Sequence, residues 1–208
     1  MFRDREDAGR QLAEKLAKYR GQDAVVLALP RGGVVTGCEI AKMLGLSLDI
    51  VVVRKIGHPL SPEYAIGAVD DKGMTILNDA ATASIDQKWL RREIERQENE
   101  ALRRVRVYRG GRKPIAISGK TALIVDDGIA TGLTIRLAAR AVRAQHPARV
   151  VIAAPVASAE AVENLLKEAD EVVVLEPPEE FLGAVGSHYI EFEQVEDAEV
   201  KELLAGKR

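Results

Sequence analysis

The sequence predicts an α/β protein with a central, mostly parallel five-stranded sheet flanked by helices. Short apolar runs, several of them rich in valine, are the expected strands: 24–29, 48–53, 121–125, 149–154 and 171–175. Apolar residues at three- and four-residue spacing predict helices over 3–20, 34–44, 133–145 and 158–169. Strands that alternate with helices in this way form parallel sheets covered on both faces.

The remaining segments follow other patterns. The stretch 54–62 contains one glycine and two prolines and predicts a loop, and 64–78 predicts a short hairpin around residues 70–73. Residues 86–107 alternate Arg and Glu along a predicted helix with a thin apolar stripe, which is typical of a solvated helix packed on one side. The tail from residue 177 departs from the alternation of strands and helices.

Composition restricts the class of protein. A chain of 208 residues suits one domain, and 47% hydrophobic residues can form a core. The net charge of −2 argues against a nucleic-acid partner, because such proteins carry a basic excess. The single cysteine, Cys38, excludes an intrachain disulfide and favours a reducing compartment. No apolar run approaches the roughly 18 residues of a membrane span, and the charged N-terminus does not resemble a signal peptide. We therefore expect a cytoplasmic protein without membrane contact.

The most informative segment is 122–134. A buried strand delivers two adjacent carboxylates, Asp126 and Asp127, to its end, and small and hydroxyl residues lead into a helix. Free amides at a helix start bind phosphate, and paired carboxylates suit paired sugar hydroxyls. The simpler alternative is a strand-to-helix turn in which one aspartate is an ordinary N-cap.

This segment resembles the phosphoribosyl pyrophosphate (PRPP) signature of type I phosphoribosyltransferases. The shared pattern is an apolar run, two acids, two variable positions, a small residue, Thr-Gly, any residue and Thr. The resemblance implies that Asp126 and Asp127 hold the ribose hydroxyls. It also implies that the following residues hold the 5-phosphate: Gly128, Ile129, Ala130, Thr131, Gly132, Leu133 and Thr134.

A second loop, Pro30-Arg31-Gly32-Gly33, follows the first predicted strand. Adjacent glycines let backbone amides approach an anion, and Arg31 adds charge. By itself the sequence Gly-Gly after a strand is as typical of a tight turn. The resemblance implies that these four residues form the family's pyrophosphate loop, with an unusual peptide geometry.

The third loop begins at Arg54-Lys55 and corresponds in order to the family's flexible loop, which closes over the reaction. Under the resemblance Arg54 and Lys55 neutralise the leaving pyrophosphate; the alternative is a solvent loop with chance positive charge. Ala130 stands where hypoxanthine–guanine members carry an aspartate, so Glu63 and Asp70 are the candidates for proton transfer.

The family builds its acceptor pocket with a variable hood from the chain ends. Here the hood is the tail, 176–208, to which the N-terminal helix can contribute. Phe181, Val185 and Tyr189 either stack on an acceptor base or form the hood's own small core. The resemblance covers about 22–175 except a helical insertion at about 79–119, within a single domain of residues 1–208.

The implied activity is transfer of ribose 5-phosphate from PRPP to a nitrogen acceptor, a nucleobase by expectation, with release of pyrophosphate. The expected cofactor is Mg²⁺, held through PRPP and water near Asp126 and Asp127 without direct protein ligands. Many type I relatives are dimers, so we expect a homodimer. The alternative is a non-catalytic regulator with the same fold that senses PRPP or a nucleotide.

Overall fold

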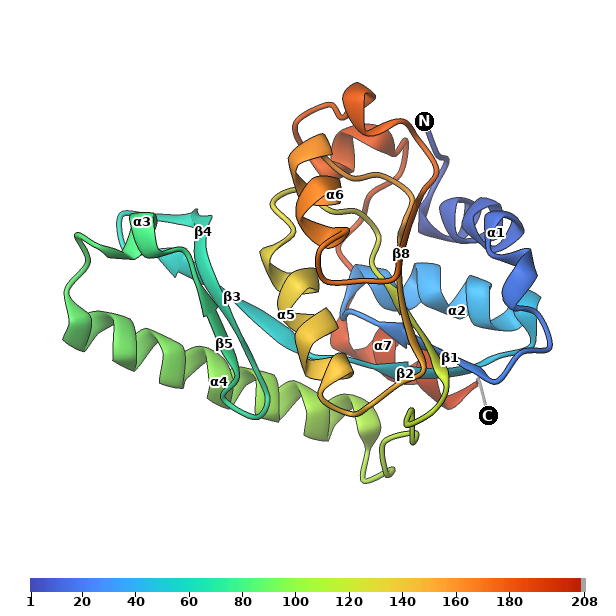
Figure 1. Ribbon diagram of the computed structural model, residues 1–208, viewed down its shortest axis with the longest axis horizontal. Coiled ribbons are helices and arrows are strands. Elements are labelled where there is room, and N and C mark those ends of the chain that lie inside the picture. Colours follow the sequence, from blue (N-terminus) through green and yellow to red (C-terminus); the bar gives the residue numbers. More distant parts are fainter. Residues whose placement is uncertain (207–208) are drawn as a thin grey trace.

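The computed structural model describes residues 1–206, which form two separate sheets (Figure 1). The larger sheet has five parallel strands in the order β2-β1-β6-β7-β8. Its strands are β1 (Ala24–Ala28), β2 (Ser47–Ile50), β6 (Thr121–Val125), β7 (Arg149–Ala154) and β8 (Glu171–Val174). This arrangement confirms the predicted fold class.

Helices cover both faces of this sheet. One face carries α1 (Arg5–Lys15), α2 (Gly32–Leu44), α7 (Asp197–Ala205) and the C-terminal part of α4 (Gln87–Arg109). The other face carries α5 (Leu133–Arg143) and α6 (Ala159–Leu165). Side chains of a strand alternate between the faces, so Val26 and Ala28 of β1 pack toward α1 and α2, whereas Val25 and Leu27 pack toward α5.

Strand register sets which loops meet. β6 lies between β1 and β7, and Ala28 at the end of β1 pairs with Val125 at the end of β6. The loop 29–31, which leads into α2, and the loop 126–132 therefore leave the sheet side by side at its carboxyl edge. Gly32 and Gly33, expected in the first of these loops, form the start of α2. Ligands bind at this edge in open parallel sheets.

The smaller sheet belongs to an arm, residues 53–109, which extends away from the five-stranded sheet at the left of Figure 1. The arm contains β3 (Val53–His58), β4 (Ser61–Asp70), β5 (Thr75–Leu77), α3 (Asp79–Thr82) and α4. The three strands are antiparallel, in the order β3-β4-β5. A separate apolar cluster, which includes Ile56, Ile66 and Leu90, packs α4 against this sheet.

Short 3₁₀ turns complete the chain: η1 (Ala17–Tyr19), η2 (Pro178–Glu180) and η3 (Val185–His188). The last two belong to the tail, which ends in α7. The amphipathic helix expected over 3–20 is therefore α1 followed by η1. Among residues 1–206, no helix combines the length and apolar character needed to cross a membrane.

The expected loop at 54–62 is wrong, because these residues form β3, a two-residue turn and the start of β4. Gly57 does not break the strand; it permits a close approach, since a Cβ at Gly57 would lie 2.3 Å from the carbonyl oxygen of Pro62. The pairing shifts register on both sides of Gly57, which marks a bulge. The hairpin expected at 64–78 is confirmed as β4 and β5.

The small cluster of the arm makes a local stability prediction. Leu90 is 4% exposed and packs in this cluster, apart from the two larger cores. We expect Leu90→Ala to destabilise the arm by about 2–5 kcal/mol. Hydrogen exchange should accelerate in β3, β4 and α4, while amides of the five-stranded sheet keep their protection. Equal acceleration throughout the chain would contradict an arm with its own core.

Candidate functional site

Asp126 and Asp127 follow β6 at the carboxyl edge, directly against the loop that follows β1. Gly32 and Gly33 allow this contact: a Cβ at Gly32 would lie 1.9 Å from Asp127 Oδ2, and one at Gly33 would lie 2.9 Å from Asp126 Oδ1. The peptide bond between Pro30 and Arg31 is cis. The structure therefore brings together the two carboxylates and the loop 30–33, which lie far apart in the sequence.

The two carboxylates differ in their surroundings. Asp126 Oδ1 accepts a hydrogen bond from the Asp127 amide at 2.9 Å. Burial, and then the negative charge of Asp127, raise the pKa of Asp126 well above its ordinary value. Asp127 instead pairs with a cation. The pair is thus a concentrated negative site in which one member is costly to ionise.

That cation is Arg5, on the first turn of α1. Its Nε donates to Asp127 Oδ2 at 2.6 Å, and its NH1 donates to the carbonyl oxygen of Glu193 at 2.7 Å. The guanidinium lies 3.7 Å from the ring centroid of Phe192, and the arginine side chain is 11% exposed. Arg5 therefore ties the N-terminal helix and the tail to the central carboxylate.

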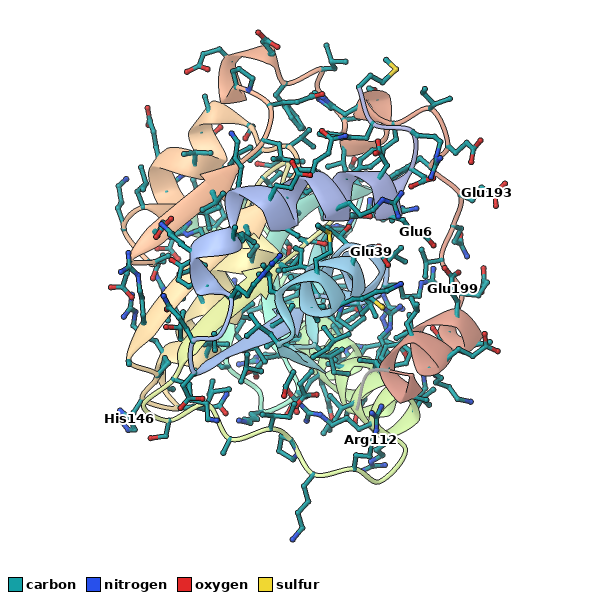
Figure 2. All side chains as sticks on the ribbon, turned by 90° about the vertical axis from the view of Figure 1, so that its right-hand side faces the viewer. Glu6, Glu39, Arg112, His146, Glu193 and Glu199 are labelled. Atoms are coloured by element: carbon teal, nitrogen blue, oxygen red, sulfur yellow. The ribbon has the colours of Figure 1, made fainter. Side chains whose placement is uncertain are left out.

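Arg5 also lines a cavity of about 260 Å³ between α1, the tail and α7. Figure 2 shows Glu6, Glu193 and Glu199, which line this cavity, on the face where these segments meet. The carboxylates of this cavity would repel a phosphate. The segments on the other sides of Asp127, residues 30–33 and the start of α5, are therefore better suited to an anion. Another cavity, of about 630 Å³, lies at the start of β2 beside Arg109 and Arg112, and its lining includes none of the predicted site residues.

The segment after Asp127 leads into α5 without a side-chain cap. Gly132 is the N-cap, with φ of 73°, a left-handed conformation that favours glycine. The first amides of a helix lack intrahelical acceptors, and the dipole there attracts negative charge. A bridge between Ile129 and Ala157, with Ser158 Oγ donating to the Ala130 carbonyl at 2.6 Å, holds the loop in place. This geometry suits a phosphate.

The hood touches this loop directly. A Cβ at Gly128 would lie 2.3 Å from Val185 Cγ1, and Tyr189 donates its hydroxyl to the Asp127 carbonyl at 2.5 Å. Tyr189 is only 6% exposed and packs between Phe2 and Phe192. Phe181 stacks on His188, whose ring hydrogen-bonds Glu176. Phe181, Val185 and Tyr189 thus pack in one cluster of the hood, and Val185 and Tyr189 are its members in contact with the loop.

Arg54 and Lys55 lie at the start of β3, not in a loop. Arg54 Nε donates to Gln97 Oε1 of α4 at 3.1 Å. Since successive strand residues face opposite sides, Lys55 faces the side of β3 that α5 covers, as its neighbour Val53 does. The structure thus places the two cations on opposite faces of the arm.

The two candidates for proton transfer fare differently. Asp70 Oδ1 accepts from the amides of Lys72 and Met74 at 2.9 and 2.8 Å, and Asp70 is 2% exposed. Its carboxylate therefore closes the β4–β5 turn, and this contact does not support a role in proton transfer. The side chain of Glu63 lies outside the described residues, so its role stays a prediction.

The junction offers carboxylate oxygen atoms to a metal ion, but the described residues do not form a complete set of ligands. Within residues 1–206, no group of three or more His, Cys, Asp or Glu side chains is arranged to hold a metal. Asp126 and Asp127 supply the hard oxygen atoms that Mg²⁺ prefers, and Mg²⁺ completes its shell with water and substrate oxygens. The donor set fits Mg²⁺ held mainly by a bound substrate.

Comparison with known proteins identifies the family and several relatives. The family model described as phosphoribosyl transferase domain matches residues 3–189. Two curated Mycobacterium tuberculosis proteins, from strains CDC 1551 and H37Rv and each named "Putative phosphoribosyl transferase", are 44% identical over 206 residues, 98% of this chain and 46% of theirs. The chain thus spans about half the length of these relatives. The crystal structure of the protein TT1426 from Thermus thermophilus is 46% identical, with a TM-score of 0.81 and coverage of 99% and 98% of the two chains.

The unlike surroundings of the two aspartates predict opposite effects on stability. Because the pKa of Asp126 is raised in the folded state, ionisation of Asp126 lowers the free energy of unfolding. This loss begins as the pH rises above the pKa of the unfolded chain, about 3.9, and is complete above the pKa of the folded protein. Asp126→Asn should therefore raise Tm at pH 8, with the gain vanishing near pH 4. Asp127→Asn removes the Arg5 pair and should lower stability by about 1–3 kcal/mol. Thermal unfolding at both pH values compares the two; a lower Tm for Asp126→Asn at pH 8 would contradict this assignment.

The contact between Gly128 and Val185 predicts a rescue. Gly128→Ala should destabilise by about 1–3 kcal/mol, because the added methyl group overlaps the Val185 side chain. Val185→Ala in the same chain should restore much of that loss. A double-mutant cycle of unfolding free energies measures the coupling, and strictly additive effects would show that the two residues do not touch.

Proposed function

Because the chain belongs to the phosphoribosyl transferase family, we propose that it transfers ribose 5-phosphate from PRPP to a nitrogen acceptor and releases pyrophosphate. The observation that carries this proposal is the junction after β1 and β6. There two adjacent carboxylates, an uncapped helix start and a loop of adjacent glycines occupy one edge of the sheet.

The donor would bind along this junction. Asp126 and Asp127 accept hydrogen bonds from the ribose 2- and 3-hydroxyls, and the amides of residues 128–134 hold the 5-phosphate with the hydroxyls of Thr131 and Thr134. Thr131 is exposed and Thr134 half-buried, so both are accessible to a ligand. The uncapped start of α5 supports the phosphate position.

The pyrophosphate would leave toward the loop 30–33. The bond between the anomeric carbon and the pyrophosphate oxygen breaks, a bond from that carbon to the acceptor nitrogen forms, and the nitrogen gives up a proton to solvent. Arg31, Gly32 and Gly33 offer backbone N–H groups to the departing charge, and Arg31 also offers its guanidinium, whereas Pro30 has no N–H to donate. Arg54 adds positive charge from the side of β3 that faces α4, and Lys55 lies on the opposite side. Bound Mg²⁺ would supply further neutralisation of the pyrophosphate oxygens.

The acceptor would lie beside the hood. Val185 and Tyr189 both contact the loop of the phosphate site. Tyr189 is buried with its hydroxyl engaged by Asp127, whereas Val185 is only half-buried. We therefore propose Val185 as the hood residue at a nucleobase, with Phe181 and Tyr189 supporting it. Ala130 provides no acid or base, so acceptors that need a protein carboxylate at this position are disfavoured.

The test is pyrophosphate release from PRPP and Mg²⁺ against a panel of nucleobases and small amines. We expect release that depends on one acceptor and falls at least about a hundredfold in Asp126→Asn/Asp127→Asn, because both diol acceptors lose their charge.

Gln11→Ala serves as the control, since Gln11 is an exposed residue of α1. If no acceptor causes pyrophosphate release but calorimetry detects binding of PRPP, the protein would instead be a non-catalytic sensor of PRPP. No binding of PRPP would contradict the proposed function outright.

A further inference from the structure

One face of α4 lies against β3, the strand that carries Arg54. Residues 97, 100, 104 and 108 recur at three- and four-residue spacing and share this face. Gln97, 7% exposed, accepts from Arg54, and Tyr108, 1% exposed, donates its hydroxyl to Asp197 Oδ1 of α7 at 2.6 Å. The sequence pattern indicated a solvated helix packed on one side.

Asp197 connects this face to the loop after β1. Arg31 NH1 lies 3.7 Å from Asp197 Oδ1 and 3.8 Å from Glu196 Oε2. These distances exceed those of a good hydrogen bond, and the Arg31 side chain is 26% exposed. Arg31 is therefore held near α4 while its donors stay available to a ligand.

Arg104 is the third arginine of this region. Its Nε donates to Glu100 Oε1 at 2.8 Å, and its side chain is 15% exposed. Within the described part of the chain, neither of its two terminal nitrogens donates a hydrogen bond. Neither nitrogen is among the buried side-chain atoms that lack a partner, so both are open to solvent and available to a ligand.

The three arginines of this region lie close enough to affect one another. Burial, and then the positive charge of Arg104, lower the pKa of Arg54, and Arg31 acts in the same direction. The same two arginines oppose the rise in the pKa of Tyr108, which burial and Asp197 raise to about 12. Glu100, Glu196 and Asp197 balance the charge of the three guanidinium groups but do not use all of their N–H donors. The remaining donors are available to an anion with several oxygen atoms.

We propose that Arg104 of α4 binds the pyrophosphate group together with Arg31 and Arg54. The ligand is a diphosphate, whose charge and many oxygen atoms match three guanidinium donors. The inference rests on the proposed function and gives the arm a direct role in it: α4 supplies a ligand-binding residue, whereas the sequence indicated only a packed surface helix.

The neighbouring arginine provides a matched control. Arg103 contacts the same carboxylate, with Nε 2.7 Å from Glu100 Oε2, but its side chain is 49% exposed. It also lies 3.3 Å from Asp197. Arg103→Gln and Arg104→Gln therefore remove the same charge from adjacent positions of one helix, and only Arg104 lies on the face that carries Gln97 and Tyr108.

The experiment is calorimetric titration of the full chain with inorganic pyrophosphate and Mg²⁺. We expect Arg104→Gln to weaken binding at least about tenfold and Arg103→Gln less than about twofold, since a charge-assisted contact is lost only in the first. Equal losses in the two variants, or none, would overturn the role of Arg104. Arg104→Lys keeps the charge and tests the same point if Arg104→Gln does not fold; unchanged affinity in a folded Arg104→Lys would contradict use of the guanidinium fork.

Ribose 5-phosphate is the second probe and separates the two proposals. Wild-type protein should bind it, and Arg104→Gln should retain that affinity within about twofold, because the helix start of α5 holds this phosphate. Binding of ribose 5-phosphate without any binding of pyrophosphate would overturn the arginine site and leave the donor site standing. Binding of neither would contradict the proposed function itself.

Discussion

The structure depends most on the close approach between the loop after β1 and the carboxylates after β6. Parallel pairing of Ala28 with Val125 aligns the two strand ends, but only residues without side chains let the loops touch. At Gly32 a single added carbon would overlap the Asp127 carboxylate. The site therefore results from strand register combined with two glycines.

The contact brings two negative charges together, and a nearby arginine offsets one of them. Asp126 and Asp127 repel each other, and Arg5 offsets the second charge through an ion pair that also fixes α1 and the tail. On the other side of the junction, Arg31 and Arg104 lie beside Glu196, Asp197 and Glu100 and keep N–H donors that these carboxylates do not use. Paired carboxylates thus lie on one side of the junction and arginine donors on the other, an arrangement that supports the proposed binding of a phosphorylated sugar with a diphosphate leaving group.

Features that depend on neighbouring residues in the chain could be predicted from the sequence. β6 and β7 have the bounds that apolar patterning predicts, and the segment 126–134 lies where the motif requires. The hairpin of β3 and β4 was missed because Gly57 and Pro62 act there as close-contact residues, although glycine and proline usually end strands. Arg5 and Arg104 were missed because charged residues on amphipathic helices resemble solvated ones until the fold supplies Asp127 and Arg54 as neighbours. Capping by Asp4 marks the start of α1, but no local pattern identifies a partner so distant in the sequence.

The central claim is that the segment from Asp126 to Thr134 holds a sugar phosphate. Titration of ¹⁵N-labelled protein with ribose 5-phosphate tests it most directly, because amide shifts report contacts independently of any turnover. The account predicts the largest shifts at the amides of residues 128–134, saturating together, and their loss in Asp126→Asn/Asp127→Asn. Shifts confined to other segments, such as the cavity beside Arg109 and Arg112, would contradict it.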